Sequence, residues 1–156
     1  MKKEEYEVIE KWGIYYKRTG HQPMLGRIMA YLMIADPPHQ SFEEIVDALK
    51  SSKSAISNTL TLMEHLGIID YTRFSGDRKR YFKINPEGFS ALFEKQYREV
   101  GHFRQLVEEI LAVRSNKNSP IKKEIQKLQL FLTMFEKEYP AFVRKWKQEA
   151  QKRFEK

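Results

Sequence analysis

Residues 41–84 read SFEEIVDALKSSKSAISNTLTLMEHLGIIDYTRFSGDRKRYFKI, and this stretch decides the fold. Its first part predicts two short helices joined by a tight turn at 50–52. Ser41-Phe42-Glu43-Glu44 matches the capping-box pattern that starts a helix. Its last part predicts a β-hairpin with a tip at Ser75-Gly76-Asp77, because Gly and Asp tolerate the positive φ angles of such turns. A helix-turn-helix followed by a hairpin is the winged-helix arrangement, so we predict a mainly α fold with a small β-wing.

The second of these helices, expected over residues 53–66, separates its side chains onto two faces at helical spacing. The apolar face holds Ile56, Leu60, Met63 and Leu66. The opposite face holds Ser54, Ser57, Asn58, Thr61 and His65. A solvated helix face usually carries Glu, Lys and Gln, which stabilise a helix better than Ser or Thr. Short polar side chains can instead enter a DNA major groove and hydrogen-bond to base edges.

The hairpin that follows is strongly basic around one acid, Asp77. Alternation along the return strand predicts Arg78 and Arg80 on one face and Lys79 on the other. We expect one arginine of the tip to enter the minor groove while the others hold phosphates. Asp77 is expected to form the turn and to pair with a neighbouring arginine. A charged tip that only aids solubility is the simpler alternative.

The start of the 53–66 helix adds two candidates for DNA contact. Ser52 or Ser51 can cap the helix, and Lys53 lies at its N-terminus, where an anion such as a phosphate is favoured. The predicted DNA-binding residues are Ser52, Lys53, Ser54, Ser57, Asn58, Thr61, Arg73, Arg78, Lys79 and Arg80.

Composition agrees with a polyanionic partner. The 156 residues carry a formal net charge of +7, which suits DNA, RNA or an anionic surface. The chain has no cysteine, which excludes disulfides and zinc–thiolate sites and fits a cytoplasmic location. The four histidines are scattered, and neither a phosphate loop nor a nucleophile with a base is visible. We therefore expect no enzyme activity, cofactor or metal. We also expect no membrane span, because the apolar run 28–35 is far shorter than the ~20 residues required.

Further helices are expected on both sides of this module. Their predicted ranges are 3–17, 24–35, 86–113 and 121–153, with a linker at 115–120. Asn85-Pro86-Glu87 is a favourable helix start, and Pro140 should kink or split the last helix. A module of about 45 residues cannot bury all their apolar faces, so they should pack on each other and on a second copy. The expected divisions are an N-terminal dimerisation helix at 1–20, the winged helix-turn-helix at 21–85 and a helical dimerisation region at 86–156.

Several motifs in the first 90 residues resemble the MarR-type winged-helix regulators, with the nearest likeness to the GbsR-type branch. The likeness is carried by Gly26–Leu32, Asp36-Pro37-Pro38, Ser41–Ile45, Ser52–Leu60, Leu66–Ile69 and Gly76–Phe82. Beyond Glu87 only the layout of two long helices matches. The resemblance implies a homodimeric repressor and, as in some members, a small-molecule effector.

Aromatic residues outside the module have two interpretations. They can form core and dimer contacts, or they can line an effector pocket that holds a quaternary ammonium group by cation–π attraction. The candidate effector-binding residues are Trp12, Tyr16, Phe103 and Phe135.

We therefore predict a sequence-specific, double-stranded-DNA-binding transcriptional regulator, a repressor that acts as a homodimer. The alternative is a winged helix used for protein interaction or structure without specific DNA binding. RNA binding would require exposed stacking aromatics, whereas Tyr81 and Phe82 are expected in the hairpin core.

Overall fold

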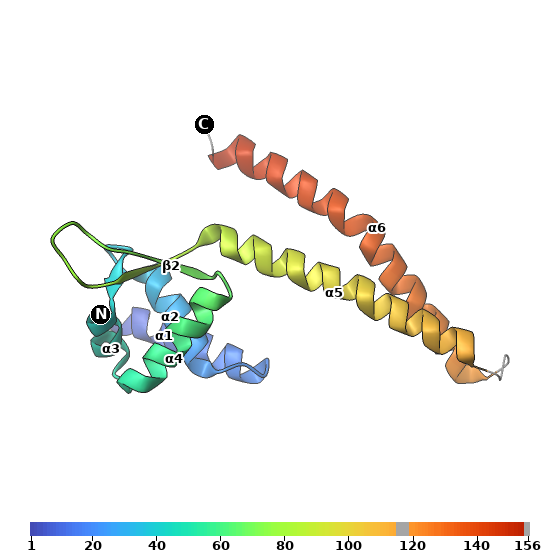
Figure 1. Ribbon diagram of the computed structural model, residues 1–156, viewed down its shortest axis with the longest axis horizontal. Coiled ribbons are helices and arrows are strands. Elements are labelled where there is room, and N and C mark those ends of the chain that lie inside the picture. The colour runs from blue at the N-terminus through green and yellow to red at the C-terminus, as the bar shows by residue number, and fades with distance from the viewer. Residues whose placement is uncertain (115–118, 155–156) are drawn as a thin grey trace. The chain divides into compact units, whose positions relative to one another are not determined.

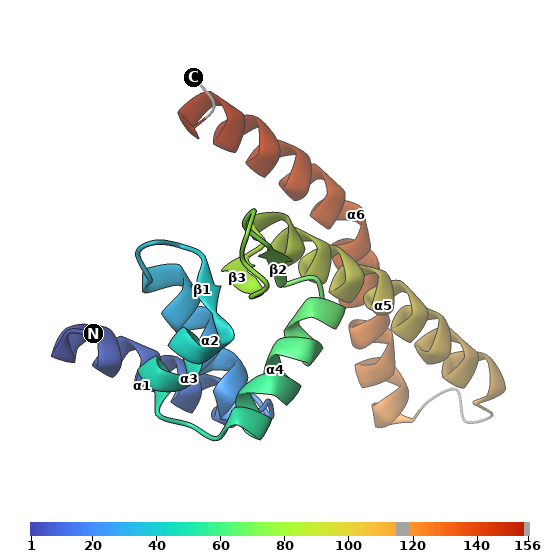
Figure 2. The same cartoon turned by 60° about the vertical axis from the view of Figure 1, so that its left-hand side comes forward.

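The computed structural model describes residues 1–114 and 119–154 and divides the chain into two compact units, residues 1–92 and 93–156. Figures 1 and 2 show the chain from two directions. The dividing point lies inside a helix. Most of the predicted linker at 115–120 lies outside the described residues.

The first unit contains the helix-turn-helix and the wing (Figure 2). Its complete elements are α1 (Lys3–Arg18), α2 (Pro23–Ile34), β1 (Gln40–Ser41), α3 (Phe42–Leu49), α4 (Lys53–His65), β2 (Ile69–Thr72) and β3 (Tyr81–Ile84). The helix α5 (Pro86–Val113) starts in this unit, and α6 (Pro120–Phe154) belongs to the second. These ranges confirm the predicted helices and hairpin strands to within one or two residues. The two-residue strand β1 was not expected, because it is too short to leave a pattern.

Local hydrogen bonds set three of the helix starts. The Ser41 Oγ accepts a bond from the Glu44 backbone N–H at 3.3 Å, and the Glu44 carboxylate accepts from the Ser41 N–H at 2.7 Å, which completes the expected capping box. The Ser52 Oγ caps α4 by accepting from the Ala55 N–H at 3.2 Å. The Asn85 Oδ1 accepts from the Glu87 N–H at 3.1 Å at the start of α5. The predicted caps are confirmed, with Ser52 rather than Ser51 used for α4.

The three strands form one antiparallel sheet in the order β1-β3-β2. Tyr71 on β2 lies opposite Phe82 on β3, and Gln40 on β1 is the other neighbour of Phe82. Phe82 is buried, so the sheet contributes one large ring to the core of the first unit. The hairpin is thereby anchored on the helices that precede it.

The core of the first unit draws on every helix of the helix-turn-helix. Its fully buried large side chains are Ile9, Ile28, Met29, Ile45, Ile56, Met63 and Ile69. Burial of each such side chain stabilises the fold by about 1.5–3 kcal/mol. Met33, in the last turn of α2, is exposed, unlike Leu32 beside it. Gly26 lets α2 approach α1 closely, since a Cβ there would lie 2.5 Å from the Trp12 carbonyl oxygen.

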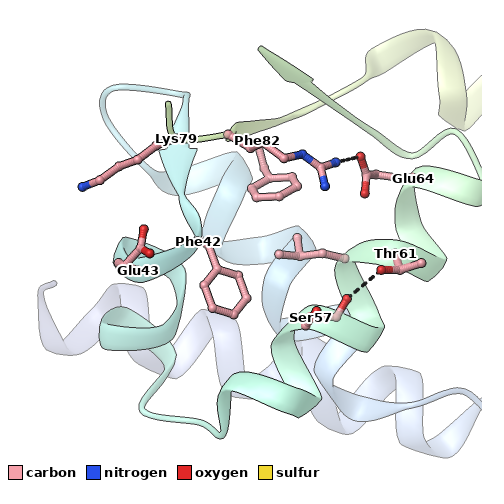
Figure 3. A pocket seen from close by; sticks show the side chains of 9 residues that line it. Phe42, Glu43, Ser57, Thr61, Glu64, Lys79 and Phe82 are labelled. Atoms are coloured by element: carbon pink, nitrogen blue, oxygen red, sulfur yellow. Dashed lines mark hydrogen bonds and ion pairs between the residues drawn. The ribbon is translucent and has the colours of Figure 1, made fainter. Parts of the chain in front are cut away.

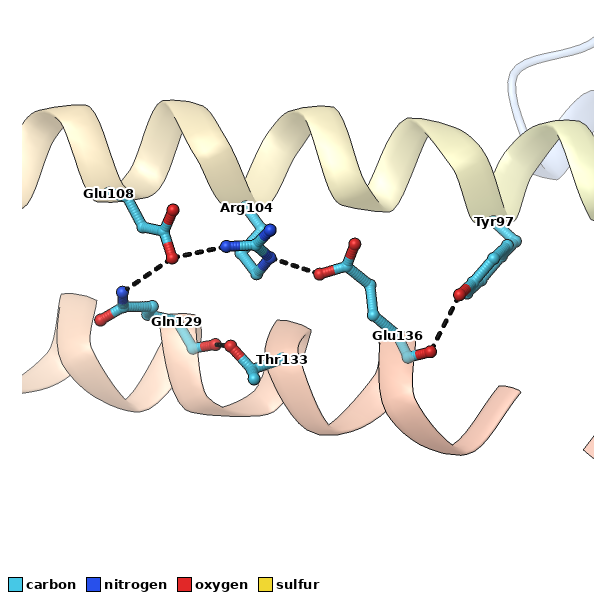
Figure 4. A network of polar contacts seen from close by, with 6 residues as sticks. All are labelled: Tyr97, Arg104, Glu108, Gln129, Thr133 and Glu136. Atoms are coloured by element: carbon cyan, nitrogen blue, oxygen red, sulfur yellow. Dashed lines mark hydrogen bonds and ion pairs between the residues drawn. The ribbon is translucent and has the colours of Figure 1, made fainter. Parts of the chain in front are cut away.

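The second unit is an antiparallel helical hairpin joined by a polar network (Figure 4). The Arg104 guanidinium on α5 bridges Glu108 on its own helix and Glu136 on α6, and the Gln129 amide donates to Glu108 at 3.2 Å. These bonds from Gln129 and Arg104 lower the pKa of Glu108. Val107 and Leu132 are buried between the helices. Polar pairs thus help to set the register of two helices whose shared apolar core is small.

Pro140 does not split α6, which is assigned as one helix from Pro120 to Phe154. Both views show its ribbon changing direction near the middle (Figures 1 and 2). Proline has no N–H and cannot bond to the carbonyl four residues earlier. That carbonyl belongs to Glu136, and it accepts a hydrogen bond from the Tyr97 hydroxyl of α5 at 2.8 Å. The kink is consistent with our prediction, whereas the split is wrong because α5 supplies the missing donor.

Candidate nucleic-acid interface

Helix α4 presents the polar face that its sequence predicts. Ser54, Ser57, Asn58 and Thr61 are all exposed, and Ile56, Leu60 and Met63 are buried on the other side. Thr59 is also buried and donates its hydroxyl to the Ala55 carbonyl at 2.8 Å, so the two threonines of the helix have different environments. The Thr61 hydroxyl donates to the Ser57 carbonyl at 3.0 Å.

Two side chains on this face are not engaged by protein. Within the part of the chain that the structure describes, the Ser57 hydroxyl and the Asn58 amide make no hydrogen bond to protein groups. The Ser52 and Ser54 hydroxyls lie 3.3 Å apart at the exposed start of the helix, beside Lys53. Donors and acceptors therefore project from about two turns of one exposed helix face, as contact with base edges requires.

The wing turns tightly at its expected tip. Gly76 has a φ of +82°, and the Asp77 N–H donates to the Phe74 carbonyl at 3.0 Å. The Asp77 carboxylate accepts from the Lys79 N–H at 2.9 Å and from the Tyr81 hydroxyl at 2.6 Å. These hydrogen bonds, that from Tyr81 first, lower the pKa of Asp77. The expected arginine partner of Asp77 is replaced by a tyrosine, because the return strand brings position 81 back beside the turn.

The basic residues of the wing fall into two groups. Arg73, Arg78 and Lys79 are exposed. Arg80 is half-buried and forms an ion pair with Glu64 of α4. Its guanidinium carbon also lies 3.9 Å from the centre of the Tyr71 ring and 5.0 Å from that of Phe82. The structure thus places nine of the ten predicted DNA-binding residues at the exposed surface and Arg80 in a contact within the protein.

A groove of about 220 Å³ separates α3, α4 and the wing (Figure 3). Phe42, Leu60 and Phe82 supply the apolar part of its lining. Ser57 and Thr61 line this groove and also belong to the exposed face of α4. The groove therefore borders the candidate nucleic-acid interface.

Sequence reasoning missed the contacts that support the wing. On one side of the hairpin, Arg80 contacts Glu64, which had no role in our prediction. On the other, the Phe74 ring packs edge-on against His39 and Tyr81, with ring centres 5.8 and 4.9 Å apart. No short-range pattern signals either contact, since each joins residues that are distant in sequence or separated by a turn.

The candidate effector residues divide between the two units. Trp12 and Tyr16 stack on α1 with ring centres 6.4 Å apart, and the Tyr16 hydroxyl lies 3.2 Å from the Met29 sulfur. Burial raises the pKa of Tyr16. Phe103 and Phe135 lie in the second unit, where Phe135 contacts the rings of Phe131, Tyr97 and Tyr139.

Neither a metal-ligand cluster nor a membrane-spanning helix occurs within residues 1–114 and 119–154. No group of three His, Asp or Glu side chains is arranged to hold a metal ion there. None of the helices described there combines the length and apolar character needed to cross a membrane.

Comparison with known proteins links the chain to regulators of transcription. It is 29% identical over 102 residues to the HTH-type transcriptional regulator MmpR5 of Mycobacterium tuberculosis, a match that covers 65% of this chain and 62% of that protein. The chain thus spans less than two thirds of the length of this relative. No family model matches the sequence.

The fold is similar to that of a solved transcriptional regulator. The crystal structure of that protein aligns with a TM-score of 0.71 at 23% identity, covering 93% of this chain and 99% of the other. The helix-turn-helix, the three-stranded sheet and this likeness agree. The chain therefore has a winged-helix fold, mainly α with a small β-wing, similar to that of this solved protein.

Proposed function

We propose that this chain is a sequence-specific DNA-binding transcriptional regulator of the MarR type. The observation that carries the proposal is the exposed Ser54, Ser57, Asn58 and Thr61 face of α4 beside the basic wing. Helix α4 would lie in the major groove, where short hydroxyl and amide side chains reach base edges. Arg73, Arg78 and Lys79 would contact phosphates or the minor groove from the wing. Similarity to MmpR5, named as an HTH-type transcriptional regulator, supports this role.

The active form in this proposal is a homodimer. Large apolar side chains on α5 and α6 are exposed in the single chain, among them Phe103, Leu106, Ile110, Leu130, Phe131 and Met134. Soluble monomers rarely expose so many on neighbouring turns, which supports association with a second copy. A dimer would present two α4 helices to half-sites about one helical turn of DNA apart. The 1–20 and 86–156 regions are the proposed dimerisation segments.

Finer assignments rest on the resemblance in the sequence. We propose a cytoplasmic repressor of the GbsR-type branch, regulated by a small molecule near Trp12, Tyr16, Phe103 and Phe135. An effector can regulate only if it binds the DNA-competent and incompetent dimers with different affinity. Quaternary amines are the first compounds to test, because aromatic faces attract such cations.

A selection experiment tests the proposal directly. The parent protein is used to select duplexes from a random-sequence library, and fluorescence anisotropy compares the selected duplex with a shuffled one of equal length. We expect an enriched inverted repeat that binds at least ~10³-fold more tightly than the shuffled DNA. A library that shows no enrichment, or equal affinity for both duplexes, would overturn specific DNA binding.

The competing function is a winged helix that binds protein or serves as a structural module. The same measurement separates the two, because such a module would bind neither duplex specifically. The exposed, unpaired state of the Ser57 and Asn58 side chains among the described residues favours the DNA-binding role, since a purely solvated face gains nothing from them over Glu or Lys.

A further inference from the structure

Arg80 is held between the hairpin and helix α4. Its Nη2 donates to the Glu64 carboxylate, and its guanidinium lies over the Tyr71 ring, with Phe82 on the neighbouring strand. The Arg80 Nε is buried and has no hydrogen-bond partner among the described residues. One of its three nitrogen atoms is therefore buried and a second already bonds to a carboxylate, which leaves fewer donors for a phosphate in this position.

Glu64 connects this contact to the polar face of α4. It lies one turn after Thr61 on the same helix, and both residues line the groove between α4 and the wing (Figure 3). Only 25% of the Glu64 side chain is exposed, compared with 39% for Arg80. The pair is thus partly protected from solvent screening, unlike an ion pair between two fully exposed side chains.

In the part of the chain that the structure describes, the exposed arginines of the wing have no such ion pair, although the Phe74 ring packs against His39 on the other side of the hairpin. Arg73 and Arg78 are exposed, and within the described residues neither forms an ion pair. The hairpin strands are short, at four residues each, and the segment between them, 73–80, lies outside the sheet ladder. A basic loop of this kind can contact DNA in register with α4 only if its base is fixed.

We infer that Arg80 is a positioning residue, which fixes the wing relative to the base-reading helix through Glu64 and does not itself hold a phosphate. The inference rests on the proposed DNA-binding function and deepens it. Arg78, two residues earlier, carries the phosphate contact. A planar guanidinium suits the positioning role because it can stack on a ring and bond to a carboxylate at once, which an ammonium group cannot do.

Hydrogen exchange in the absence of DNA tests whether the Arg80–Glu64 ion pair, called the clamp below, fixes the wing. In Glu64→Gln the charge partner is removed while every wing residue is kept. We expect peptides covering 72–81 to exchange faster than in the parent, with peptides from α2 and α6 unchanged. Equal exchange of the wing in the two proteins would overturn the clamp. Unchanged exchange in α2 also verifies that the variant is folded.

DNA titrations at several salt concentrations test the positioning role. Arg78→Gln and Arg80→Gln remove the same charge from the same loop, which makes each the control for the other. With the selected duplex, Arg78→Gln should flatten the log–log salt slope by about 0.9 for each phosphate that the variant no longer neutralises. Arg80→Gln should keep the parent slope and weaken binding about fivefold. Arg80→Lys, which keeps the charge, should also weaken binding.

The direction in which Glu64→Gln changes DNA affinity separates the positioning role from a simple effect of charge. It removes a negative charge near the DNA, so electrostatics alone would tighten binding, whereas disruption of the clamp should weaken it about fivefold. The Glu64→Gln, Arg80→Gln double variant should be no weaker than either single variant, because both break the same ion pair. Equal slopes for Arg78→Gln and Arg80→Gln, or tighter binding by Glu64→Gln, would overturn the inference. A parent that bound no DNA would instead overturn the proposed function.

Discussion

At the scale of single residues, Asn58 is the sharpest test of base reading. Its amide is exposed on α4, and its side chain is unpaired among the described residues. Asn58→Ala should weaken binding to the selected duplex by ~1–3 kcal/mol and reduce the preference over shuffled DNA. Anisotropy with both duplexes measures the two effects.

Thermal unfolding provides the control for that variant, because truncation of an exposed side chain should leave the melting temperature nearly unchanged. If Asn58→Ala weakened binding to both duplexes by the same factor, Asn58 would contribute to general DNA affinity and would not read bases.

Gly88, in the first turn of α5, packs closely against the backbone of Gly67, and a substitution there tests whether the fold needs this close approach. A Cβ at this position would lie 1.8 Å from the Gly67 carbonyl oxygen and 2.7 Å from the Gly67 carbonyl carbon. Because backbone cannot move aside cheaply, Gly88→Ala should lower the free energy of unfolding by about 1–3 kcal/mol or more, measured by urea titration.

Gly101→Ala is the matched control in the same helix. Its Cβ would lie 2.8 Å from the Glu136 carboxylate, which pairs with Arg104 but ends a flexible side chain rather than being backbone. The gain in helix propensity, ~1 kcal/mol, offsets that displacement. A Gly88 variant as stable as this control would show that α5 does not need the close approach.

At the scale of elements, a double-mutant cycle can test whether the Tyr97 hydroxyl satisfies the carbonyl that Pro140 leaves without its helical partner in α6. Tyr97→Phe keeps the ring that stacks on Tyr139, with centres 4.3 Å apart, and removes the hydroxyl that bonds to the Glu136 carbonyl. It should lower the free energy of unfolding by about 1 kcal/mol. In a Pro140→Ala background the same change should have little effect, because an alanine at that position supplies its own backbone N–H to the carbonyl. Additive effects in the cycle would contradict this account.

The start of α3 predicts a pH dependence. The Ser41 hydroxyl and N–H hold the pKa of Glu44 below its ordinary value. A lowered pKa in the folded state stabilises the protein above the unfolded value, about 4.3, and this contribution disappears as the pH falls through the folded pKa. Ser41→Ala should therefore narrow the difference in melting temperature between pH 7 and a pH below about 3.

Ser51→Ala, which removes a hydroxyl that does not cap a helix, should keep the difference seen in the parent. If Ser41→Ala also left this pH-dependent difference in melting temperature unchanged, the ionisation of Glu44 would not depend on the capping box.

At the scale of the whole molecule, the exposed apolar residues of α5 and α6 predict self-association. We expect the mass of a dimer in light scattering at micromolar concentration. Met134→Glu should shift the mass toward a monomer, because a buried charge without a partner is strongly unfavourable. Lys137→Gln changes the net charge by the same amount on an exposed position of the same helix and should remain dimeric.

A monomeric parent with a complete unfolding transition would remove the dimer from the proposal. A dimer unaffected by Met134→Glu would instead move the interface to another surface. These outcomes are separate from DNA binding by a single winged-helix unit, so each can be judged independently.

The sequence alone determined the local features of this protein. The caps at Ser41, Ser52 and Asn85, the turn at Gly76 and the two-faced pattern of α4 were all predictable. Each depends on residues within about four positions of one another, where backbone geometry and hydrogen-bonding chemistry leave few alternatives. The winged-helix fold followed from their order along the chain.

Only the tertiary structure decided what the charged residues of the wing and the long helices contact. Arg80 pairs with Glu64, 16 residues away, and Tyr97 bonds to the Glu136 carbonyl, 39 residues away. Asp77 bonds to Tyr81 rather than to an arginine, because the hairpin closes on that side. A charged or polar side chain has many partners of equal chemistry in the sequence, and only the packing of the apolar core selects which of them it meets.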